Sequence, residues 1–292
     1  MRLSKIKKTM ERVKELPTLS VVANKVNAVL NDPTSSTSDL AKIIECDQSI
    51  TAKILALANS SQYSLPQRVT NISQAISLLG YKNVSYIVMT ISVFDALRNK
   101  KSAFDRTRFW MHSIAVAIMS MKISKECMYT FKEDVFTAGL LHDIGKVFMD
   151  GYLHEEFREV LNTANKNNIS FFEAENMLYD VNHTMIGEWI ARTWKLPIHV
   201  IATIKHHHQE PQHRQGLSVS TDVSVDYIRT ADVAVRVIGI GSNGDGKSYK
   251  PQLGSELFTR LPLDFEDVIG LSKQLEDEIK KSQTLLSLAV EG

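Results

Sequence analysis

Histidine and aspartate residues at five places in this 292-residue sequence carry side chains that bind divalent metal ions. Each place lies in or beside an apolar stretch that we expect to be helical. A centre for two metal ions needs neutral imidazole nitrogens and carboxylates that point into one pocket. The sequence therefore indicates a metal site built from several helices, with candidates at His112, His142-Asp143, His183, His206-His207-His208 and Asp232.

The pair His142-Asp143 is the strongest of these signals, because it places an imidazole beside a carboxylate in the apolar segment 138–146. From one helix, the aspartate can bridge two ions while the histidine binds one of them. Two ions lower the pKa of a shared water and neutralise charge on a phosphoryl group, so phosphoester hydrolysis is the natural reaction class. Lys146, one helical turn further on, can reach a phosphate oxygen. Asp143 and Lys146 are therefore the candidate catalytic residues.

Taken singly, most of these residues have an ordinary structural explanation. A lone histidine on an apolar helix, such as His112, is more often a hydrogen-bonded core residue. A histidine that opens a helix, such as His183, is unremarkable, and a histidine run at a helix end can be solvated charge. Asp232 is harder to explain, because a carboxylate in an apolar run needs a partner. The metal-site prediction therefore depends on the whole set.

Helices are predicted throughout, because apolar residues recur at spacings of three and four rather than two. In the first part of the chain they cover residues 21–30, 40–44, 50–58, 72–79 and 84–97. We expect Thr37-Ser38-Asp39 and Ser49 to supply N-caps, and Gly80 to end its helix. A polar break at residues 98–102 then divides the chain into an N-terminal helical bundle, 1–100, and a second domain, 101–292.

The second domain is predicted to contain a longer series of helices. They cover residues 109–123, 133–148, 155–166, 171–179, 183–194, 198–205 and 223–240, followed by helices near 253–259 and 264–288. In this interpretation His142-Asp143 lies inside the single helix 133–148.

Composition excludes several classes of protein. The net charge of +1 argues against a general polyanion binder. The sequence contains only two cysteines, which fit a reduced compartment and no disulfide framework. We find no apolar run of ~18 residues and therefore no membrane span. The basic N-terminus lacks an apolar signal core, so a cytoplasmic location is expected.

Two motifs look informative but fit their surroundings poorly. Residues 241–248 match the phosphate-binding loop pattern letter for letter, but that loop should leave a strand and enter a helix. Here it follows a predicted helix, and Pro251 stands close behind, so we expect a flexible connector. Residues 70–84 can be read as a helix-turn-helix, but they lack a basic recognition face, and DNA binding is not expected.

The ordered motifs resemble the HD superfamily of metal-dependent phosphohydrolases, and within it the HD-related output domain (HDOD) family. The resemblance covers roughly residues 12 to 240 and is carried by Leu16-Pro17, segments 50–60, 72–80 and 139–146, and Trp194-Lys-Leu-Pro197 followed by His207-His208. It implies an all-α fold in which an HD-like helical bundle follows an N-terminal helical subdomain. It also implies a bacterial signal-transduction protein.

The superfamily pattern implies metal ligands at His112, His142, Asp143 and Asp232. The related HD-GYP phosphodiesterases add histidines that match His183, His207 and His208. Two departures limit the likeness. No Gly-Tyr-Pro follows the histidine run, which argues against hydrolysis of a cyclic dinucleotide. Arg108 stands where some members have a glutamate one turn before the first histidine, which favours two ions over three.

Two hypotheses remain open on the sequence. In the first, an HD-type di-metal centre gives the protein phosphohydrolase activity. In the second, the protein is a non-catalytic regulatory binding module whose metal is structural or vestigial. Nitrogen and oxygen ligands without a thiolate favour Fe or Mn, with Mg, Ni and Zn also compatible. The expected partner is a regulatory protein, or a phosphorylated small molecule or nucleotide.

Overall fold

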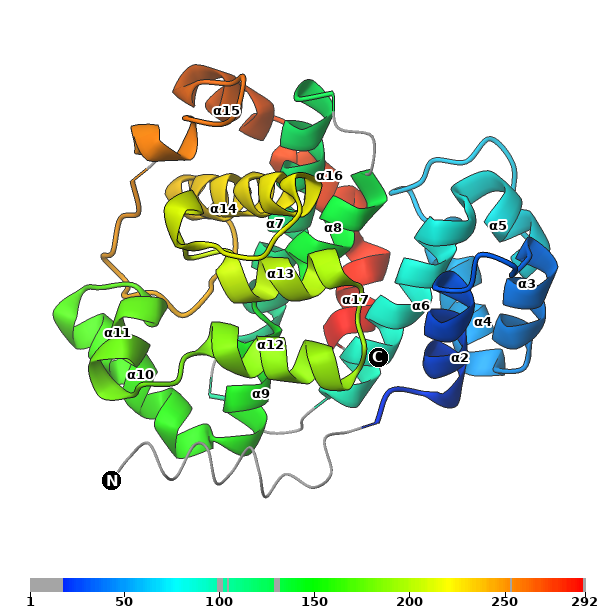
Figure 1. Cartoon of the computed structure of the whole chain (residues 1–292), viewed down its shortest axis with the longest axis horizontal. Helices are drawn as coiled ribbons and strands as arrows, with labels where there is room; N and C mark the ends of the chain where they lie inside the picture. Colours follow the sequence, from blue (N-terminus) through cyan, green and yellow to red (C-terminus); the bar gives the residue numbers. More distant parts are fainter. Residues whose placement is uncertain (1–17, 99–101, 104, 129–131, 253, 291–292) are drawn as a thin grey trace. The chain divides into compact units, whose positions relative to one another are not determined.

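The structure, a computed structural model, describes residues 18–98, 102–103, 105–128, 132–252 and 254–290. All regular secondary structure in these ranges is helical, which confirms the predicted all-α class (Figure 1). Leu16 and Pro17, two residues of the HDOD-like pattern, lie outside the described residues. Within the described part, no single helix has both the length and the apolar composition to cross a membrane.

The chain folds as two compact units, and the last helix of the chain groups with the N-terminal helices. Among the described residues, the smaller unit combines 18–98 with 276–290, whereas those between 102 and 275 belong to the larger unit. The sequence-based division placed all of 101–292 in one domain. The C-terminal segment groups differently because helix α17 (Gln283–Val290) buries Leu285 and Leu286 and packs on α4 and α6 of the smaller unit.

The smaller unit is built around α6 (Tyr81–Ala96), whose residues from Val84 to Phe94 are buried. It is packed by helices α2 (Val21–Leu30), α3 (Thr37–Glu45), α4 (Gln48–Ala58), α5 (Ile72–Leu79) and α17. Gly80 joins α5 to α6 with φ 92°, a conformation that glycine adopts readily and other residues rarely do, and the two helices meet at 116°. The predicted end of a helix at Gly80 is therefore observed.

The N-caps of two helices in this unit lie one or two residues before the capping residues that the sequence predicted. Helix α3 is capped by Ser36, whose side chain accepts from Asp39 N–H. The Asp39 carboxylate in turn accepts from Ser36 N–H. Helix α4 is capped by Asp47, not Ser49, because the Asp47 carboxylate accepts from Ile50 N–H. Both capping residues have the extended backbone that an N-cap requires, whereas Ser49 already lies inside the helix.

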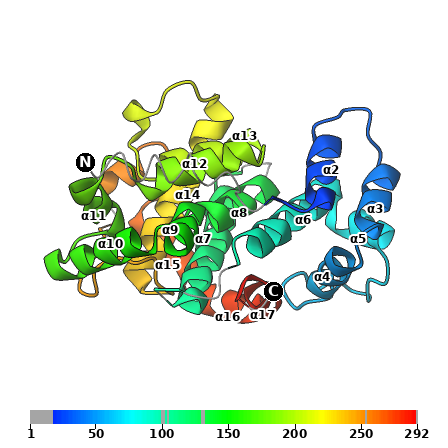
Figure 2. The ribbon, with the colours of Figure 1, turned by 90° about the horizontal axis from the view of Figure 1, so that it is seen from below.

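The larger unit is organised around α7 (Arg106–Glu126), which is buried at nearly every position from Phe109 to Ser120. It packs most extensively on α8 (Lys132–Leu141) and α14 (Val219–Ile238) (Figures 1 and 2). The unit also contains α9 (Ile144–Tyr152), α10 (His154–Asn167), α11 (Phe171–Leu178), α12 (His183–Thr193), α13 (Ile198–His206) and α15 (Phe265–Ser272), and α16 (Leu275–Lys281) starts at its last residue.

Three of the predicted helices are interrupted or shortened. The predicted helix 133–148 is two helices, because α8 ends at Leu141 and α9 begins at Ile144. His142 and Asp143 lie in the turn between them, where Asp143 has φ −102° and ψ 14°. The predicted helix 264–288 is divided into α15, α16 and α17. In the region 253–259, the described residues contain only a 3-10 turn, Ser255–Leu257.

Helices α9 and α12 approach each other closely at two glycines. A Cβ atom built on Gly145 of α9 would lie 2.0 Å from the carbonyl oxygen of His183 and 3.0 Å from the backbone nitrogen of Gly187, both on α12. Only glycine permits such close contact between backbones. Gly145, two residues after Asp143, therefore sets the distance between the helix α12, which begins at His183, and the α8–α9 turn that contains His142 and Asp143 (the HD turn).

The 241–251 loop, which the sequence predicted as a flexible connector, is hydrogen-bonded to the helices around it and packed against them. Gly241 packs so closely on α7 that an added Cβ would lie 2.5 Å from the amide nitrogen of His112. The backbone N–H of Ser242 donates to Arg108 O, and that of Gly246 donates to Ile169 O. The loop follows the helix α14, so the strand that a phosphate-binding loop requires is missing at this point.

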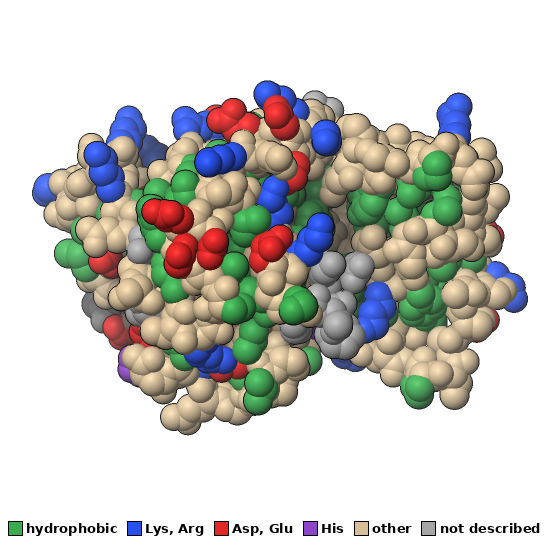
Figure 3. Space-filling model, turned by 90° about the horizontal axis from the view of Figure 1, so that it is seen from above, with side chains coloured by type: hydrophobic (Ala, Val, Ile, Leu, Met, Phe, Trp, Pro, Cys, Tyr) green, Lys and Arg blue, Asp and Glu red, His purple; other side chains and the backbone are tan. Residues whose placement is uncertain are grey.

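The surface shown in Figure 3 carries basic and acidic side chains interspersed, without an extended basic patch. Histidine side chains are almost absent from this face. This agrees with the burial of His112, His142, His183 and His207 in the interior of the larger unit.

Candidate metal centre

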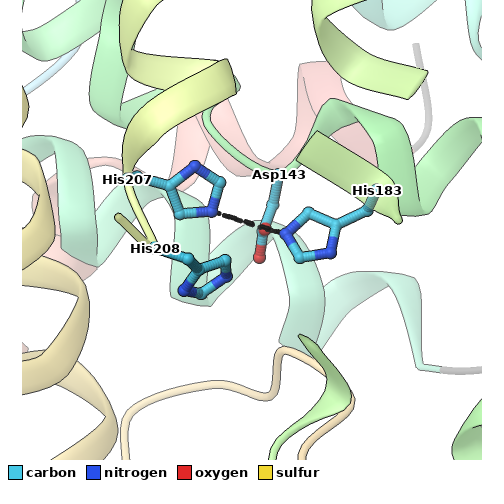
Figure 4. A group of neighbouring side chains, drawn as sticks. All are labelled: Asp143, His183, His207 and His208. Atoms are coloured by element: carbon cyan, nitrogen blue, oxygen red, sulfur yellow. Dashed lines mark hydrogen bonds and ion pairs between the residues drawn. The ribbon is translucent and has the colours of Figure 1, made fainter. Parts of the chain in front are cut away.

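The residues that the family resemblance implied as metal ligands lie together in the larger unit, whereas His206, also a candidate from the sequence, belongs to neither group of donors. Five structural elements contribute them: α7 gives His112, the α8–α9 turn gives His142 and Asp143, α12 gives His183, the end of α13 gives His207 and His208, and α14 gives Asp232. Their donor atoms form two groups, each within 4.8 Å: His112, His142 and Asp143, and Asp143, His183, His207 and His208 (Figure 4). Asp143 belongs to both.

The two carboxylate oxygens of Asp143 face different groups. Oδ1 lies 3.2 Å from His183 Nε2 and 3.6 Å from His207 Nε2. Oδ2 lies 3.3 Å from His142 Nε2 and 2.7 Å from Lys146 Nζ. A carboxylate whose oxygens are divided in this way is suited to bridge two cations, with one on each side.

The second group has the spacing of a metal coordination sphere. His183 Nε2 lies 3.4 Å from His207 Nε2, and both lie beside Asp143 Oδ1. An ion with bonds of about 2.1 Å separates adjacent donors by roughly 3.0–3.5 Å, depending on the bond angle. His208 completes the group, and its ring stacks on Phe172 with centroids 4.4 Å apart.

Asp232 joins the first group from α14. Its Oδ1 lies 3.1 Å from His112 Nε2 and 3.9 Å from His142 Nε2. His112 and Asp232 are 120 residues apart in the sequence but are adjacent here, because α7 and α14 pack along each other. The first group therefore offers two imidazoles and two carboxylates.

Several donor atoms at the centre are buried without a hydrogen bond of acceptable geometry within the described part of the chain. They are His112 Nε2, His142 Nε2, Asp143 Oδ1, His208 Nε2 and Asp232 Oδ1. Buried polar atoms are nearly always satisfied, and leaving one unsatisfied costs about 1–3 kcal/mol. These atoms lie in the two groups of donors, and divalent cations bound to the groups would satisfy them.

Backbone carbonyls orient two of the imidazoles. His142 Nδ1 lies 2.7 Å from Gly139 O, and His207 Nδ1 lies 3.1 Å from Thr203 O. When the Nδ1–H group donates to a carbonyl, the proton is fixed on that nitrogen and the Nε2 lone pair faces the centre. Metal-bound histidines are generally oriented in this way.

Glu175 orients His183 and was not singled out by the sequence analysis. The carboxylate is fully buried on α11, and it accepts from the backbone N–H of His183 at 2.7 Å and from its Nδ1 at 2.5 Å. The available signal was an acidic residue on the face of α11 that also buries Phe171 and Ala174. A buried glutamate needs a partner, and here the partner is a candidate ligand, His183.

Arg236 was also missed. Its guanidinium lies 2.8 Å from Asp232 Oδ2 and 3.2 Å from Asp245 Oδ2, with 10% of the side chain exposed. The signal was its position four residues after Asp232 on the same helix, where opposite charges meet.

The carboxylates of the centre are ionised despite their burial. Burial opposes ionisation of Asp143, but the neighbouring charges of Lys146 and His142 outweigh it and hold its pKa well below the ordinary range. Burial likewise opposes ionisation of Asp232, and Arg236 is the main group that lowers its pKa. Both residues are therefore ready to bind cations at neutral pH.

Most of the imidazoles with shifted pKa values favour the neutral form, as metal ligation requires. Burial lowers the pKa of His112, lowers that of His207 to about 4, and lowers that of His208 well below its usual value. His183 is the exception. Burial lowers its pKa, but Glu175 outweighs this effect, and the net shift is upward.

Comparison with known proteins identifies the family. The HDOD domain model matches residues 16–210. The chain belongs to the HDOD domain family. It is similar over 98% of its length to an HDOD domain protein of unknown function from Geobacter sulfurreducens, with 25% identity, a TM-score of 0.77 and 97% of that chain covered. The resemblance noted in the sequence is thereby confirmed.

Two further solved structures share the fold of this HDOD protein. One is a provisionally named phosphohydrolase of Shewanella amazonensis SB2B, with 21% identity, a TM-score of 0.74, and 97% of this chain and 98% of that chain covered. The other is a provisionally named signal transduction protein of Marinobacter aquaeolei VT8, with 20% identity, a TM-score of 0.73, and 96% of this chain and 61% of that chain covered.

A curated relative, an uncharacterized protein of Treponema pallidum (strain Nichols), is 23% identical over 202 residues. The match covers 69% of this HDOD chain and 39% of the relative. The relative is therefore much longer than the part that the two proteins share.

Lys146 lies inside the centre, where it pairs with the shared carboxylate. It is 2% exposed, with Nζ 2.7 Å from Asp143 Oδ2 and 5.2 Å from the centre of the Phe171 ring. The sequence analysis expected this lysine to reach a phosphate oxygen. In this HDOD structure its ammonium group pairs with Oδ2 of Asp143, whereas His183 faces Oδ1.

The residues at the two positions that depart from the HD-GYP pattern make hydrogen bonds within this unit. Arg108 donates to Gly241 O at 3.2 Å, so a guanidinium stands one helical turn before His112. After the histidine run, Gln209 Oε1 lies 2.6 Å from Nδ1 of His206, which belongs to neither group of donors.

Proposed function

We propose that this HDOD protein is a bacterial signal-transduction protein whose centre holds two divalent metal ions, Fe or Mn, and hydrolyses a phosphoester. The observation that carries the proposal is the division of the Asp143 oxygens between two groups of donors. The names of the Shewanella and Marinobacter proteins agree with a phosphohydrolase and with a signalling role. The Fe or Mn assignment rests on a ligand set of imidazoles and carboxylates without thiolates.

Bound divalent ions supply positive charge that polarises a phosphoryl oxygen and lowers the pKa of a water molecule. The chain's own residues prepare the site for this. His142, Asp143, His112 and Asp232 would hold one ion, and Asp143 would bridge to a second ion held by His183, His207 and His208. Glu175 keeps the Nε2 atom of His183 directed at the centre.

The enclosure of the centre favours the alternative, a non-catalytic binding module with a structural metal. His112, His142, Asp143, His183 and His207 are all at most 2% exposed. His208 is less buried than these residues, and Phe172, itself partly exposed, stacks on its ring. A substrate would therefore have to enter on the side of His208.

Elemental analysis of purified protein tests the metal centre. We expect about two ions per chain in the wild type after reconstitution with Fe or Mn, and a loss of both ions in Asp143→Ala, because that carboxylate is shared. Asp277→Ala is the matched control, since the Asp277 side chain is 75% exposed. A wild type that stays metal-free after reconstitution would refute the proposal.

A second measurement separates the two functions. The loaded wild type is assayed against phosphomonoesters, phosphodiesters and cyclic nucleotides, with Asp143→Ala as the inactive reference. Hydrolysis by the wild type alone supports the phosphohydrolase. A fully loaded protein that hydrolyses none of these substrates supports the binding module.

A further inference from the structure

Asp245 lies in the glycine-rich 241–251 loop and makes two contacts that lead to the metal centre. Its Oδ1 accepts from the backbone N–H of Phe171, the first residue of α11, at 2.8 Å. Its Oδ2 accepts from Arg236 Nη1 at 3.2 Å. The same guanidinium, through Nη2, lies 2.8 Å from Oδ2 of the candidate ligand Asp232.

The contact with Arg236 bears on the orientation of Asp232. Arg236 is held between two carboxylates, so its charge is shared and its guanidinium cannot turn fully toward Asp232. Arg236 occupies Oδ2 of Asp232, while Oδ1 faces His112 and His142. Without the charge of Asp245, the cation of Arg236 would compete more strongly with a metal ion for the carboxylate of Asp232.

The contact with the backbone N–H of Phe171 holds the start of α11. This helix carries Phe172, which stacks on His208, and Glu175, which binds the backbone and the Nδ1 atom of His183. A shift at the helix start would move both residues, and with them two ligands of the second group. Arg236 alone therefore connects Asp245 to Asp232 of the first group, and the short helix α11 connects Asp245 to the second group.

The loop that carries Asp245 packs closely on neighbouring helices at its glycines. Gly244 has φ 92°, and an added Cβ would lie 2.8 Å from a ring carbon of Phe171. At Gly246 an added Cβ would lie 2.5 Å from Ala164 O. These glycines permit close packing on α10 and α11, which explains the glycine pattern without a bound phosphate.

We propose that Asp245 is a positioning residue for both halves of the metal centre, acting on Asp232 through Arg236 and on His183 through α11. This inference rests on the proposed di-metal centre. Residues that orient metal ligands typically change metal affinity 10- to 100-fold when they are replaced. We therefore expect Asp245→Asn to bind Mn²⁺ about 10- to 100-fold more weakly at both sites.

The test is a Mn²⁺ titration of the full chain by calorimetry, together with electron paramagnetic resonance of the loaded protein. The wild type should bind two ions and show the spectrum of a coupled Mn²⁺ pair. Asp245→Asn should bind both ions more weakly and lose the coupled spectrum at Mn²⁺ concentrations that saturate the wild type. Asp245→Glu, which keeps the charge, should restore part of the affinity.

Asn165→Ala is the matched control, because Asn165 Oδ1 anchors the same loop through Lys247 N–H at 3.1 Å but does not contact the ligand network. It should bind Mn²⁺ like the wild type. Equal losses in Asn165→Ala and Asp245→Asn would show general loop damage and overturn the inference. If Asp245→Asn does not fold, Arg236→Gln and Glu175→Gln test the two connections separately.

The outcomes distinguish this inference from the proposed function. A wild type that binds no Mn²⁺ overturns the di-metal centre itself. A wild type that binds two ions, with unchanged affinity in Asp245→Asn, overturns only the role of Asp245. Weakening of one ion alone would overturn the claim that Asp245 acts on both halves.

Discussion

Replacement of Gly145 by alanine should separate the HD turn from the helix that begins at His183. The added Cβ would lie 2.0 Å from His183 O, 2.8 Å from His183 C and 3.0 Å from Gly187 N. All three atoms belong to the backbone, so no side chain can rotate away. To reach an ordinary contact of 3.4 Å, the closest pair must move apart by about 1.4 Å.

The expected cost follows from two opposing effects. Overpacking in a well-packed interior typically costs 1–3 kcal/mol, and a contact this short belongs at the upper end of that range. Alanine in place of glycine stabilises a helix by up to about 1 kcal/mol. We therefore expect Gly145→Ala to lower the free energy of unfolding of the larger unit by about 2 kcal/mol. For a unit of this size, that corresponds to about 4–8 °C in melting temperature.

Differential scanning calorimetry of the metal-free chain measures this shift, and a Mn²⁺ titration measures its effect on the site. Affinity should fall as well, because His183 moves with its carbonyl and its Nε2 atom lies only 3.2 Å from Asp143 Oδ1. Gly270→Ala is the control, since no atom lies within 4 Å of an added Cβ inside α15. It should melt at or slightly above the wild-type temperature.

The reasoning would be refuted if Gly145→Ala melted within about 1 °C of the wild type and bound Mn²⁺ equally well. That result would mean that α9 and α12 can separate at no cost. The close approach at Gly145 would then not control the position of His183.

Three further changes test the site and the fold. Glu175→Gln should weaken Mn²⁺ binding about 10- to 100-fold, because the carboxylate no longer orients His183; unchanged affinity in calorimetry would contradict this. The metal-free chain should lose stability as the pH falls from about 6.5 to 4, by about 3 kcal/mol from His207 alone, because the unfolded chain protonates this residue near 6.5 and the folded chain only at about 4. Urea unfolding at pH 7 and 4.5 measures the loss of free energy of unfolding. The loss should be smaller in His207→Asn, and an equal loss in the variant and the wild type would contradict this role of His207. Asp47→Ala should destabilise the smaller unit by about 1 kcal/mol through loss of the α4 cap, whereas Ser49→Ala should have little effect; the reverse order in thermal melts would show that the cap is misassigned.

The helical class and the approximate helix positions could be predicted from local sequence, because the spacing of apolar residues depends on neighbours within a few turns. Helix ends were less predictable. The break at His142 and Asp143 is invisible to periodicity, since apolar residues continue from α8 into α9. The membership of α17 was equally hidden, because it depends on packing against α4 and α6, far away in sequence.

For the site, the sequence by itself determined the types of donor and their order along the chain, from His112 to Asp232. Imidazoles and carboxylates in apolar segments need partners, and that requirement can be read locally. Only the tertiary structure decided which donors lie together, that Asp143 divides its oxygens between two groups, that Glu175 contacts His183, and that Asp245 contacts Phe171. The reason is physical: a side chain's orientation is fixed by contacts with distant segments, and no local pattern encodes those contacts.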